Sequence, residues 1–113
     1  MKIIVATCLS VFFAVTAQAS SVSDAKITEV RSGTWYGQKV TFKVSPSPTL
    51  PACNTLESRG HYVIDLSKQG SNAWLSMILS AKAAQTNVQV WGTDSCISIN
   101  GFKGEELETI AIQ

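Results

Sequence analysis

The chain has 113 residues, of which 45% are hydrophobic and 15% are charged. This length allows one domain and excludes a multidomain enzyme. With a formal net charge of +1, the sequence gives no electrostatic reason to expect a nucleic-acid partner or a polybasic membrane patch. The charged fraction is below that of a typical soluble sequence and the mean hydropathy is positive, so the location of the apolar residues has to be explained first.

Residues 1–19 have the three parts of a secretory signal peptide. A short basic start ends at Lys2, residues 3–15 form a nearly unbroken apolar run, and the small residues of the triplet Ala-Gln-Ala end at Ala19. Such a pattern predicts cleavage between Ala19 and Ser20. The run of about thirteen residues is shorter than the roughly 20 that a membrane-spanning helix needs. A retained membrane anchor is the alternative interpretation.

Cleavage after Ala19 would leave residues 20–113 as a single exported domain. Lys2 would be lost with the signal, so the acidic and basic side chains that remain would balance. We expect no stable membrane insertion after cleavage, because no later apolar stretch is long enough to cross a bilayer as a helix. The minimal basic start and compact apolar run are typical of a bacterial Sec-type signal, which predicts a periplasmic or secreted protein.

Two cysteines, Cys53 and Cys96, remain once Cys8 is removed with the signal. An even number of cysteines in a small exported chain predicts a disulfide between them. The loop that it closes would stabilise the fold by about 4 kcal/mol in the chain-entropy treatment. The alternative is a pair of free thiols on a metal ion, but the sequence has no CxxC pair and the single histidine, His61, is not spaced as a further ligand. We therefore expect no metal site.

Two strands are predicted before the proline-rich segment. Residues 20–24 are small and polar and are expected to fray, whereas residues 26–31 mix branched and charged side chains as a half-buried strand does. Residues 40–44 alternate apolar and polar side chains, which is the clearest period of two in the chain. All three prolines lie within residues 46–54, so this segment is predicted to be an irregular loop.

The middle of the chain predicts a strand followed by a helix. Residues 61–66 have a nearly continuous apolar centre and are predicted to form a third strand. Residues 70–72 (Gly-Ser-Asn) offer helix N-cap chemistry. Apolar residues then recur every three or four positions over residues 73–84, which predicts a helix whose apolar face, including Trp74, packs on the core.

The last third of the chain predicts two more strands. Residues 88–91 alternate and end at Gly92, and residues 107–113 alternate up to the C-terminus. Residues 97–104 are expected to be loop-like because they contain three residues that favour turns, Asn100, Gly101 and Gly104.

The predicted fold is mainly β with one helix, in the order β-β-β-α-β-β. Five short strands in so small a domain leave exposed edges unless the sheet closes. A single helix between the third and fourth strands is the arrangement of the OB-fold, so we expect a five-stranded OB-like Greek-key barrel. An open α+β sandwich is the alternative, because it has the same order of elements.

Four segments of the chain resemble a known group of exported proteins. They are residues 62–67, 73–84, 88–96 and 108–112, and they are similar to the B subunits of AB5 bacterial toxins and, more closely, to small secreted proteobacterial proteins of the same build. The resemblance implies an OB-fold. It also implies a homo-oligomer, a pentamer in the toxins, that binds cell-surface glycans.

No group of residues has the pattern of a catalytic site. His61 has no accompanying nucleophile motif, and no serine lies in a GxSxG sequence. Asp65 is interpreted as a hydrogen-bonded carboxylate at a strand end, and Glu105, Glu106 and Glu108 as a solvated acidic loop. We therefore expect no enzyme activity and no cofactor. A small hydrolase is a remote alternative, because it would need a site that the sequence does not show.

Three aromatic residues are candidates for ligand binding. Trp35 and Tyr36 lie between the first two predicted strands, and neighbouring residues on a strand point to opposite faces, so at least one ring should leave the core. Trp91 shares the outer face of its strand with Gln89. Exposed rings stack on sugars and are enriched in protein interfaces. The alternative for each is an ordinary core or isolated surface position.

The leading hypothesis is a non-enzymatic exported binding module that engages a glycan or protein ligand through these aromatic side chains. The alternative is a periplasmic or secreted accessory or inhibitory protein that acts through protein–protein contacts.

Overall fold

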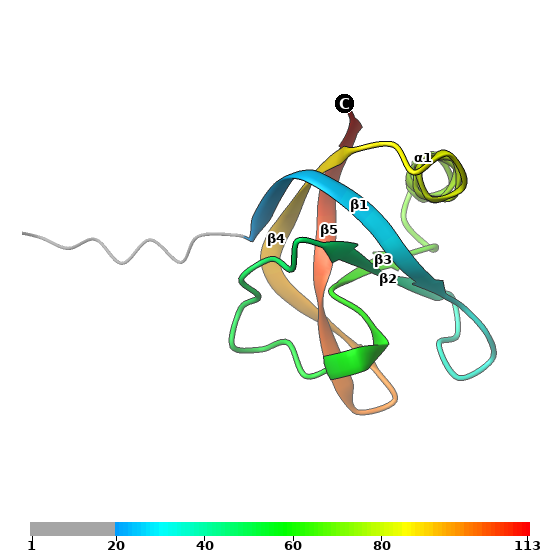
Figure 1. Ribbon diagram of the computed structural model, residues 1–113. Helices are drawn as coiled ribbons and strands as arrows, with labels where there is room; N and C mark the ends of the chain where they lie inside the picture. Colours follow the sequence, from blue (N-terminus) through cyan, green and yellow to red (C-terminus); the bar gives the residue numbers. More distant parts are fainter. Residues whose placement is uncertain (1–19) are drawn as a thin grey trace, which may run out of the picture.

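The computed structural model describes residues 20–113, so the predicted signal peptide lies outside the described residues. The elements in chain order are β1 (Ser21–Arg31), β2 (Lys39–Ser45), the short 3-10 helix η1 (Glu57–Arg59), β3 (Tyr62–Asp65), α1 (Ser71–Ala84), β4 (Val88–Ile99) and β5 (Phe102–Ile112) (Figure 1). The predicted mainly β fold, with one α-helix between the third and fourth strands, is confirmed.

The five strands form one sheet that closes in a ring. Their order is β1-β2-β3-β5-β4, and β4 pairs again with β1. The β3–β5 pair is parallel and the other pairs are antiparallel, so the sheet is mixed. Closure pairs the edges that an open sheet would expose, and the open sandwich alternative is wrong.

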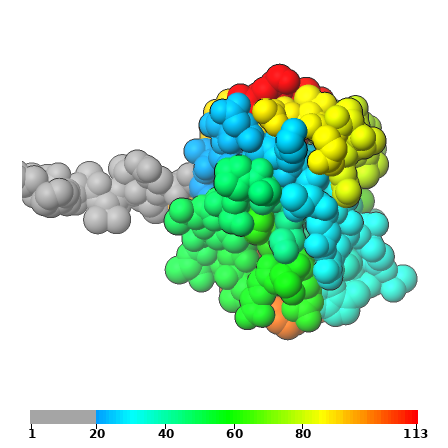
Figure 2. Space-filling view, viewed as in Figure 1, coloured from blue at the N-terminus to red at the C-terminus, as the bar shows by residue number. Residues whose placement is uncertain are grey.

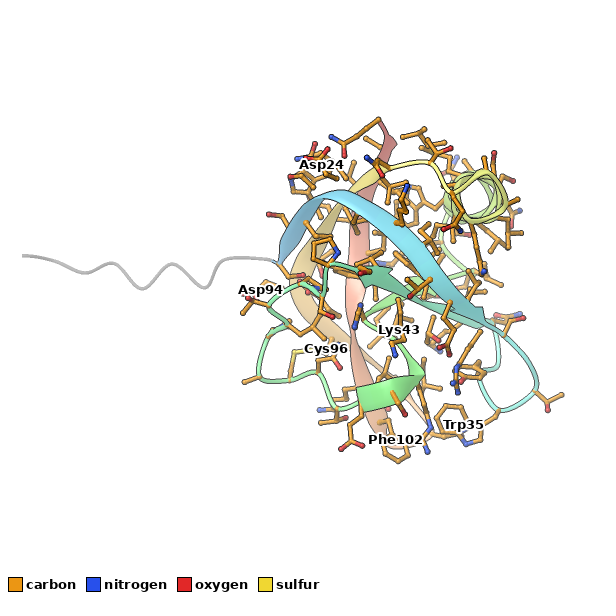
Figure 3. All side chains as sticks on the ribbon, in the orientation of Figure 1. Asp24, Trp35, Lys43, Asp94, Cys96 and Phe102 are labelled. Carbon is orange, nitrogen blue, oxygen red and sulfur yellow. A yellow bond between two sulfur atoms is a disulfide. The ribbon has the colours of Figure 1, made fainter. Side chains whose placement is uncertain are left out.

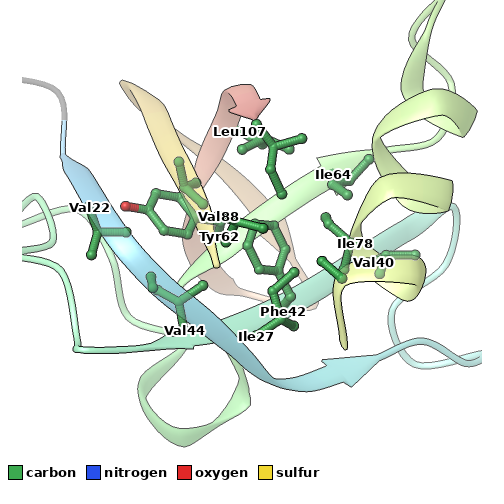
Figure 4. Packing of buried hydrophobic residues seen from close by; sticks show 14 residues of the cluster. Val22, Ile27, Val40, Phe42, Val44, Tyr62, Ile64, Ile78, Val88 and Leu107 are labelled. Atoms are coloured by element: carbon green, nitrogen blue, oxygen red, sulfur yellow. The ribbon is translucent and has the colours of Figure 1, made fainter. Parts of the chain in front are cut away.

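The predicted alternation in β2 is confirmed. Val40, Phe42 and Val44 are buried inside the ring, and the Phe42 ring stacks on Tyr62 of β3 with 5.5 Å between ring centroids (Figure 4). Thr41 is buried as well, which the alternation does not predict. Its hydroxyl donates a hydrogen bond to the Arg59 carbonyl at 2.7 Å, so its burial leaves no hydroxyl group unsatisfied.

Helix α1 contacts β1, β3 and β5. Ile78 and Ala81 are buried, and Trp74 packs against the same core from a partly buried position, as predicted. The predicted side-chain N-cap is absent from this helix: Gly70 occupies the N-cap position without a side-chain bond. The Ser71 hydroxyl instead donates to the Leu66 carbonyl at 3.2 Å, which joins the start of the helix to the segment after β3.

The structure corrects two predicted segment boundaries. Residues 20–24 do not fray, because β1 begins at Ser21, which pairs with Trp91 of β4. Residues 97–104 are not a loop, because β4 and β5 continue through them to a tight hairpin. Asn100 and Gly101 occupy its turn with φ of 48° and 84°, the left-handed conformation that two-residue hairpin turns need.

The predicted disulfide is confirmed. Cys53 and Cys96 are bonded, with their Cα atoms 6.1 Å apart and 43 positions apart in the chain. The bond ties the proline-rich segment to β4. A small domain with a disulfide is typical of proteins outside the cytoplasm. Within residues 20–113, no helix is long and apolar enough to cross a membrane.

Candidate functional site

Trp35 and Tyr36 lie in the segment between β1 and β2, which stands at the edge of the molecule (Figure 2). They are in a turn rather than on a strand, so the expectation that strand geometry separates their rings is wrong. The turn is held by two backbone bonds, from Tyr36 N to the Gly33 carbonyl at 3.0 Å and from Gly37 N to the Thr34 carbonyl at 3.2 Å. Trp35 is 38% exposed, and Tyr36 is partly buried.

An arginine and a third aromatic residue complete this surface. The Trp35 ring lies edge-on to Tyr36, with centroids 4.9 Å apart, and 5.9 Å from the Phe102 ring. The Arg59 guanidinium is 5.2 Å from the Trp35 centroid and 4.5 Å from the Phe102 centroid. We call Trp35, Tyr36, Arg59 and Phe102 the aromatic–arginine patch; Figure 3 labels Trp35 and Phe102 at the same end of the molecule.

Two hydrogen bonds and one hydrophobic cluster hold the patch in place. The Asn100 side chain, in the β4–β5 turn, donates a hydrogen bond to the Trp35 carbonyl. The Arg59 carbonyl accepts the hydrogen bond from Thr41, which ties η1 to β2. Tyr36 and Phe102 also pack on a small buried cluster formed by Leu56, Val63 and Ile99. The rings of Tyr36 and Phe102 are therefore supported by a second, smaller hydrophobic core.

The charge of Arg59 is not neutralised by a carboxylate. Among residues 20–113 the ion pairs are Arg31 with Glu29 and Lys68 with Glu106, and neither includes Arg59. Arg59 instead contacts two ring faces, an interaction worth about 0.5–1 kcal/mol at an exposed site. Its hydrogen-bond donors are therefore not committed to an ion pair within the described chain.

The third aromatic candidate lies elsewhere. Trp91 is partly exposed on β4 and pairs with Thr109, far along the β4–β5 ladder from the Ile99–Phe102 pair that closes the hairpin. None of the aromatic pairs among residues 20–113 joins Trp91 to Trp35. The structure thus brings together two of the three predicted aromatic residues.

Sequence reasoning missed Arg59 and Phe102. Asn100-Gly101 is a strong hairpin signal and could have placed Phe102 at the start of a strand beside a turn. No sequence signal places Arg59 against Trp35, because their contact depends on how η1 packs on the ring of strands.

The remaining titratable candidates are hydrogen bonded within the fold. The Nδ1 atom of His61 accepts a hydrogen bond from Val44 N at 3.1 Å. Burial, and secondarily the charge of Lys43, lowers the pKa of His61. As predicted, Asp65 is a hydrogen-bonded carboxylate at a strand end: it accepts bonds from Ser67 N at 3.0 Å and from Ser67 Oγ at 2.6 Å. These bonds lower the pKa of Asp65.

The acidic cluster is not a solvated loop. Glu105 lies within β5 and its exposed fraction is 0%, because the closed ring surrounds this position. Glu106 is partly buried and paired with Lys68, and Glu108 is exposed as predicted.

The described residues contain no cluster of three or more His, Cys, Asp or Glu side chains that could hold a metal ion. Within residues 20–113, no pocket is found either. Comparison with protein-family models, curated proteins and solved structures finds no match to this chain.

Proposed function

We propose that this protein is an exported, non-enzymatic binding module that recognises an acidic glycan through the aromatic–arginine patch. The observation that carries the proposal is the position of Arg59, stacked on Trp35 and Phe102 with no ion-pair partner among the described residues. A planar guanidinium with free donors suits a carboxylate, to which it can donate two parallel bonds.

The neighbouring rings supply the second part of the recognition. Trp35 combines an exposed flat ring with a backbone carbonyl that is fixed by Asn100. Rings of this kind present a large apolar face at little cost in side-chain entropy, and the C–H face of a sugar ring can stack on them. A sugar that carries a carboxylate, such as a uronic or sialic acid, would stack on Trp35 and accept hydrogen bonds from Arg59.

The strand order supports an OB-like Greek-key barrel. The ring β1-β2-β3-β5-β4, its parallel β3–β5 pair and the helix between β3 and β4 agree with that architecture. Together with the resemblance to toxin B subunits, this favours a glycan ligand and a homo-oligomer, with a pentamer as the form to test. We place the protein in the periplasm or outside the cell, exported by a Sec-type signal that is cleaved after Ala19.

A glycan array tests the proposal directly. The chain that begins at Ser20 should bind sialylated or uronate-containing glycans and not their neutral counterparts. Trp35→Ala and Arg59→Gln should each weaken binding by about tenfold or more, which corresponds to about 1.4 kcal/mol. Arg59→Lys should recover only part of the loss, because a lysine keeps the charge but not the planar donor pair.

Leu79→Ala is the matched control, because Leu79 is 50% exposed on α1, outside the patch. It should leave binding unchanged, and all variants should keep the thermal midpoint of the wild type within a few degrees. An array without binding above background would remove the glycan proposal. Binding that is insensitive to Trp35→Ala would place the site elsewhere, and Trp91→Phe would then test the outer face of β4.

A protein ligand is the second candidate function. Tryptophan, tyrosine and arginine are the residue types most enriched in protein-binding hot spots, and the patch contains all three. A stoichiometric partner captured by crosslinking in the cell envelope, and lost with Trp35→Ala, would favour an accessory or inhibitory protein. A monodisperse pentamer in native mass spectrometry would favour the toxin-like module.

A further inference from the structure

Ser20, the first described residue, is held in the interior by each of its polar groups. It is only 6% exposed. Its backbone N donates to Glu105 Oε2 at 3.3 Å, its carbonyl accepts from Gly92 N at 2.9 Å, and its hydroxyl donates to Glu105 Oε1. The residue that follows the predicted cleavage point is therefore an integral part of a buried polar cluster.

The centre of this cluster is the carboxylate of Glu105. A side chain at Gly92 would overlap it, so Gly92 provides the space that the carboxylate occupies. The Glu105 carboxylate also accepts a hydrogen bond from Asp94 N at 3.0 Å. The Tyr62 hydroxyl is hydrogen bonded to Ser20 Oγ at 2.8 Å. Burial is the main cause that raises the pKa of Tyr62 to about 12, and the charge of Glu105 acts in the same direction.

This carboxylate has only neutral donors within the described chain. None of the ion pairs among residues 20–113 includes Glu105. A buried carboxylate without a counter-charge is unfavourable even when hydrogen bonds satisfy it, because its charge is removed from water. One of these neutral donors, the backbone nitrogen of Ser20, would be charged in a chain that begins at this residue.

We infer that removal of the signal peptide creates the missing counter-charge. Hydrolysis of the Ala19–Ser20 peptide bond by a signal peptidase consumes one water molecule and leaves a carboxylate on Ala19 and an ammonium group on Ser20. The nitrogen that donates one amide hydrogen bond to Glu105 becomes a cation with three donors at the same position. Processing thereby converts a neutral contact into a buried ion pair between Ser20, which directly precedes β1, and Glu105 of β5.

This pair makes the stability of the domain depend on its processing. The ammonium group forms only on cleavage and the Cys53–Cys96 disulfide only in an oxidising compartment, so the precursor in the cytoplasm lacks both bonds. A less stable precursor is easier to keep unfolded for translocation, and the mature chain gains its full stability where it is used. The inference goes beyond the proposed binding function and rests only on the proposed cleavage.

The test compares chains that differ only at the amino terminus. One begins with a free Ser20, a second carries an α-N-acetyl group on Ser20, and a third has one glycine before Ser20. Each is made with Glu105 and with Glu105→Gln, and urea unfolding gives the folding equilibrium constants. With Glu105, acetylation or extension should reduce the constant by about tenfold or more, since either change removes the counter-charge from its position.

With Glu105→Gln, the same changes should reduce the constant by less than about threefold, because no buried charge is left to neutralise. Equal losses in both backgrounds would show a steric effect and overturn the inference. An unchanged folding equilibrium constant in the Glu105 background would also overturn the inference.

A pH series keeps the test decisive if Glu105→Gln does not fold. The advantage of the free terminus over the acetylated one should disappear as the pH rises and the ammonium group loses its proton. Tyr62 of β3, whose hydroxyl contacts Ser20, and Asp94 of β4, whose backbone N–H donates to Glu105, are present in both chains, so the two chains differ only at the terminal nitrogen. An advantage that stays constant through this range would overturn the inference.

Intact mass of the exported protein tests the first step separately. A mature chain that begins at Ser20 supports the inference, and one that begins at another residue overturns it without bearing on glycan binding.

Discussion

Replacing Cys53 and Cys96 with alanine should strongly destabilise the domain. The two residues are 43 positions apart, and closing a loop of this length lowers the entropy of the unfolded chain by an amount worth about 4 kcal/mol at 25 °C. Both cysteines are only partly buried, so the loss of packing adds little to this value. For a domain of this size, whose total stability is about 5–10 kcal/mol, the change removes a large part of the free energy of unfolding.

Urea unfolding followed by tryptophan fluorescence measures this effect. The double variant should unfold at a much lower urea concentration, and its m-value should rise because an unfolded chain without the cross-link exposes more surface. Thermal unfolding should show a midpoint lowered by roughly 15–30 °C.

A control separates the cross-link from the side chains. Reduction of the wild type under the same conditions should reproduce the change, and a reductant should have no effect on the double variant. A loss below about 1 kcal/mol with an unchanged m-value would refute the reasoning from unfolded-state entropy.

Three further outcomes are expected. Because burial lowers the pKa of His61, the folded state favours the neutral imidazole; the free energy of unfolding should therefore fall as the pH drops below about 6.5, and His61→Asn should lack this contribution when unfolding is measured across the range. Gly104→Ala should cost about 1–3 kcal/mol in urea unfolding, since the added methyl group overlaps the side chains of Leu56 and Val63. Because the pKa of Tyr62 is raised to about 12, its phenol should stay protonated in ultraviolet titration until the pH passes well above 10, and stability should decline as the pH rises through this interval; a tyrosine that ionises near 10 in the folded state would contradict its burial.

Local patterns were sufficient wherever one element carried its own signal. The alternation over residues 40–44 predicted β2 because its apolar side chains line the core on one face. The three- and four-residue spacing that starts near Trp74 predicted α1 for the same reason. The pairing of Cys53 with Cys96 needed no geometry, because two cysteines in an exported chain have a single intramolecular pairing.

Local patterns failed where a distant strand decided the outcome. The small polar residues after Ser20 have no strand pattern of their own, and they are ordered because Ser21 pairs with Trp91 on β4. Asn100, Gly101 and Gly104 predicted a loop over residues 97–104, whereas Asn-Gly forms the turn of a hairpin whose strands pair through this segment. Gly104 lies inside β5 because it pairs with Ile97 of β4, and the side chain of Leu56 fills the space that a larger residue there would need.

The amino-acid order alone specified the periodicity of the elements and the disulfide, since these depend on neighbours along the chain or on counting cysteines. Closure of the sheet decided the rest. It brought Arg59 and Phe102 to Trp35 from separate elements, and it buried Glu105 beside Ser20. Ring contacts and buried charges depend on positions in space, and a charged residue has the same appearance in a sequence whether water or a closed sheet surrounds it.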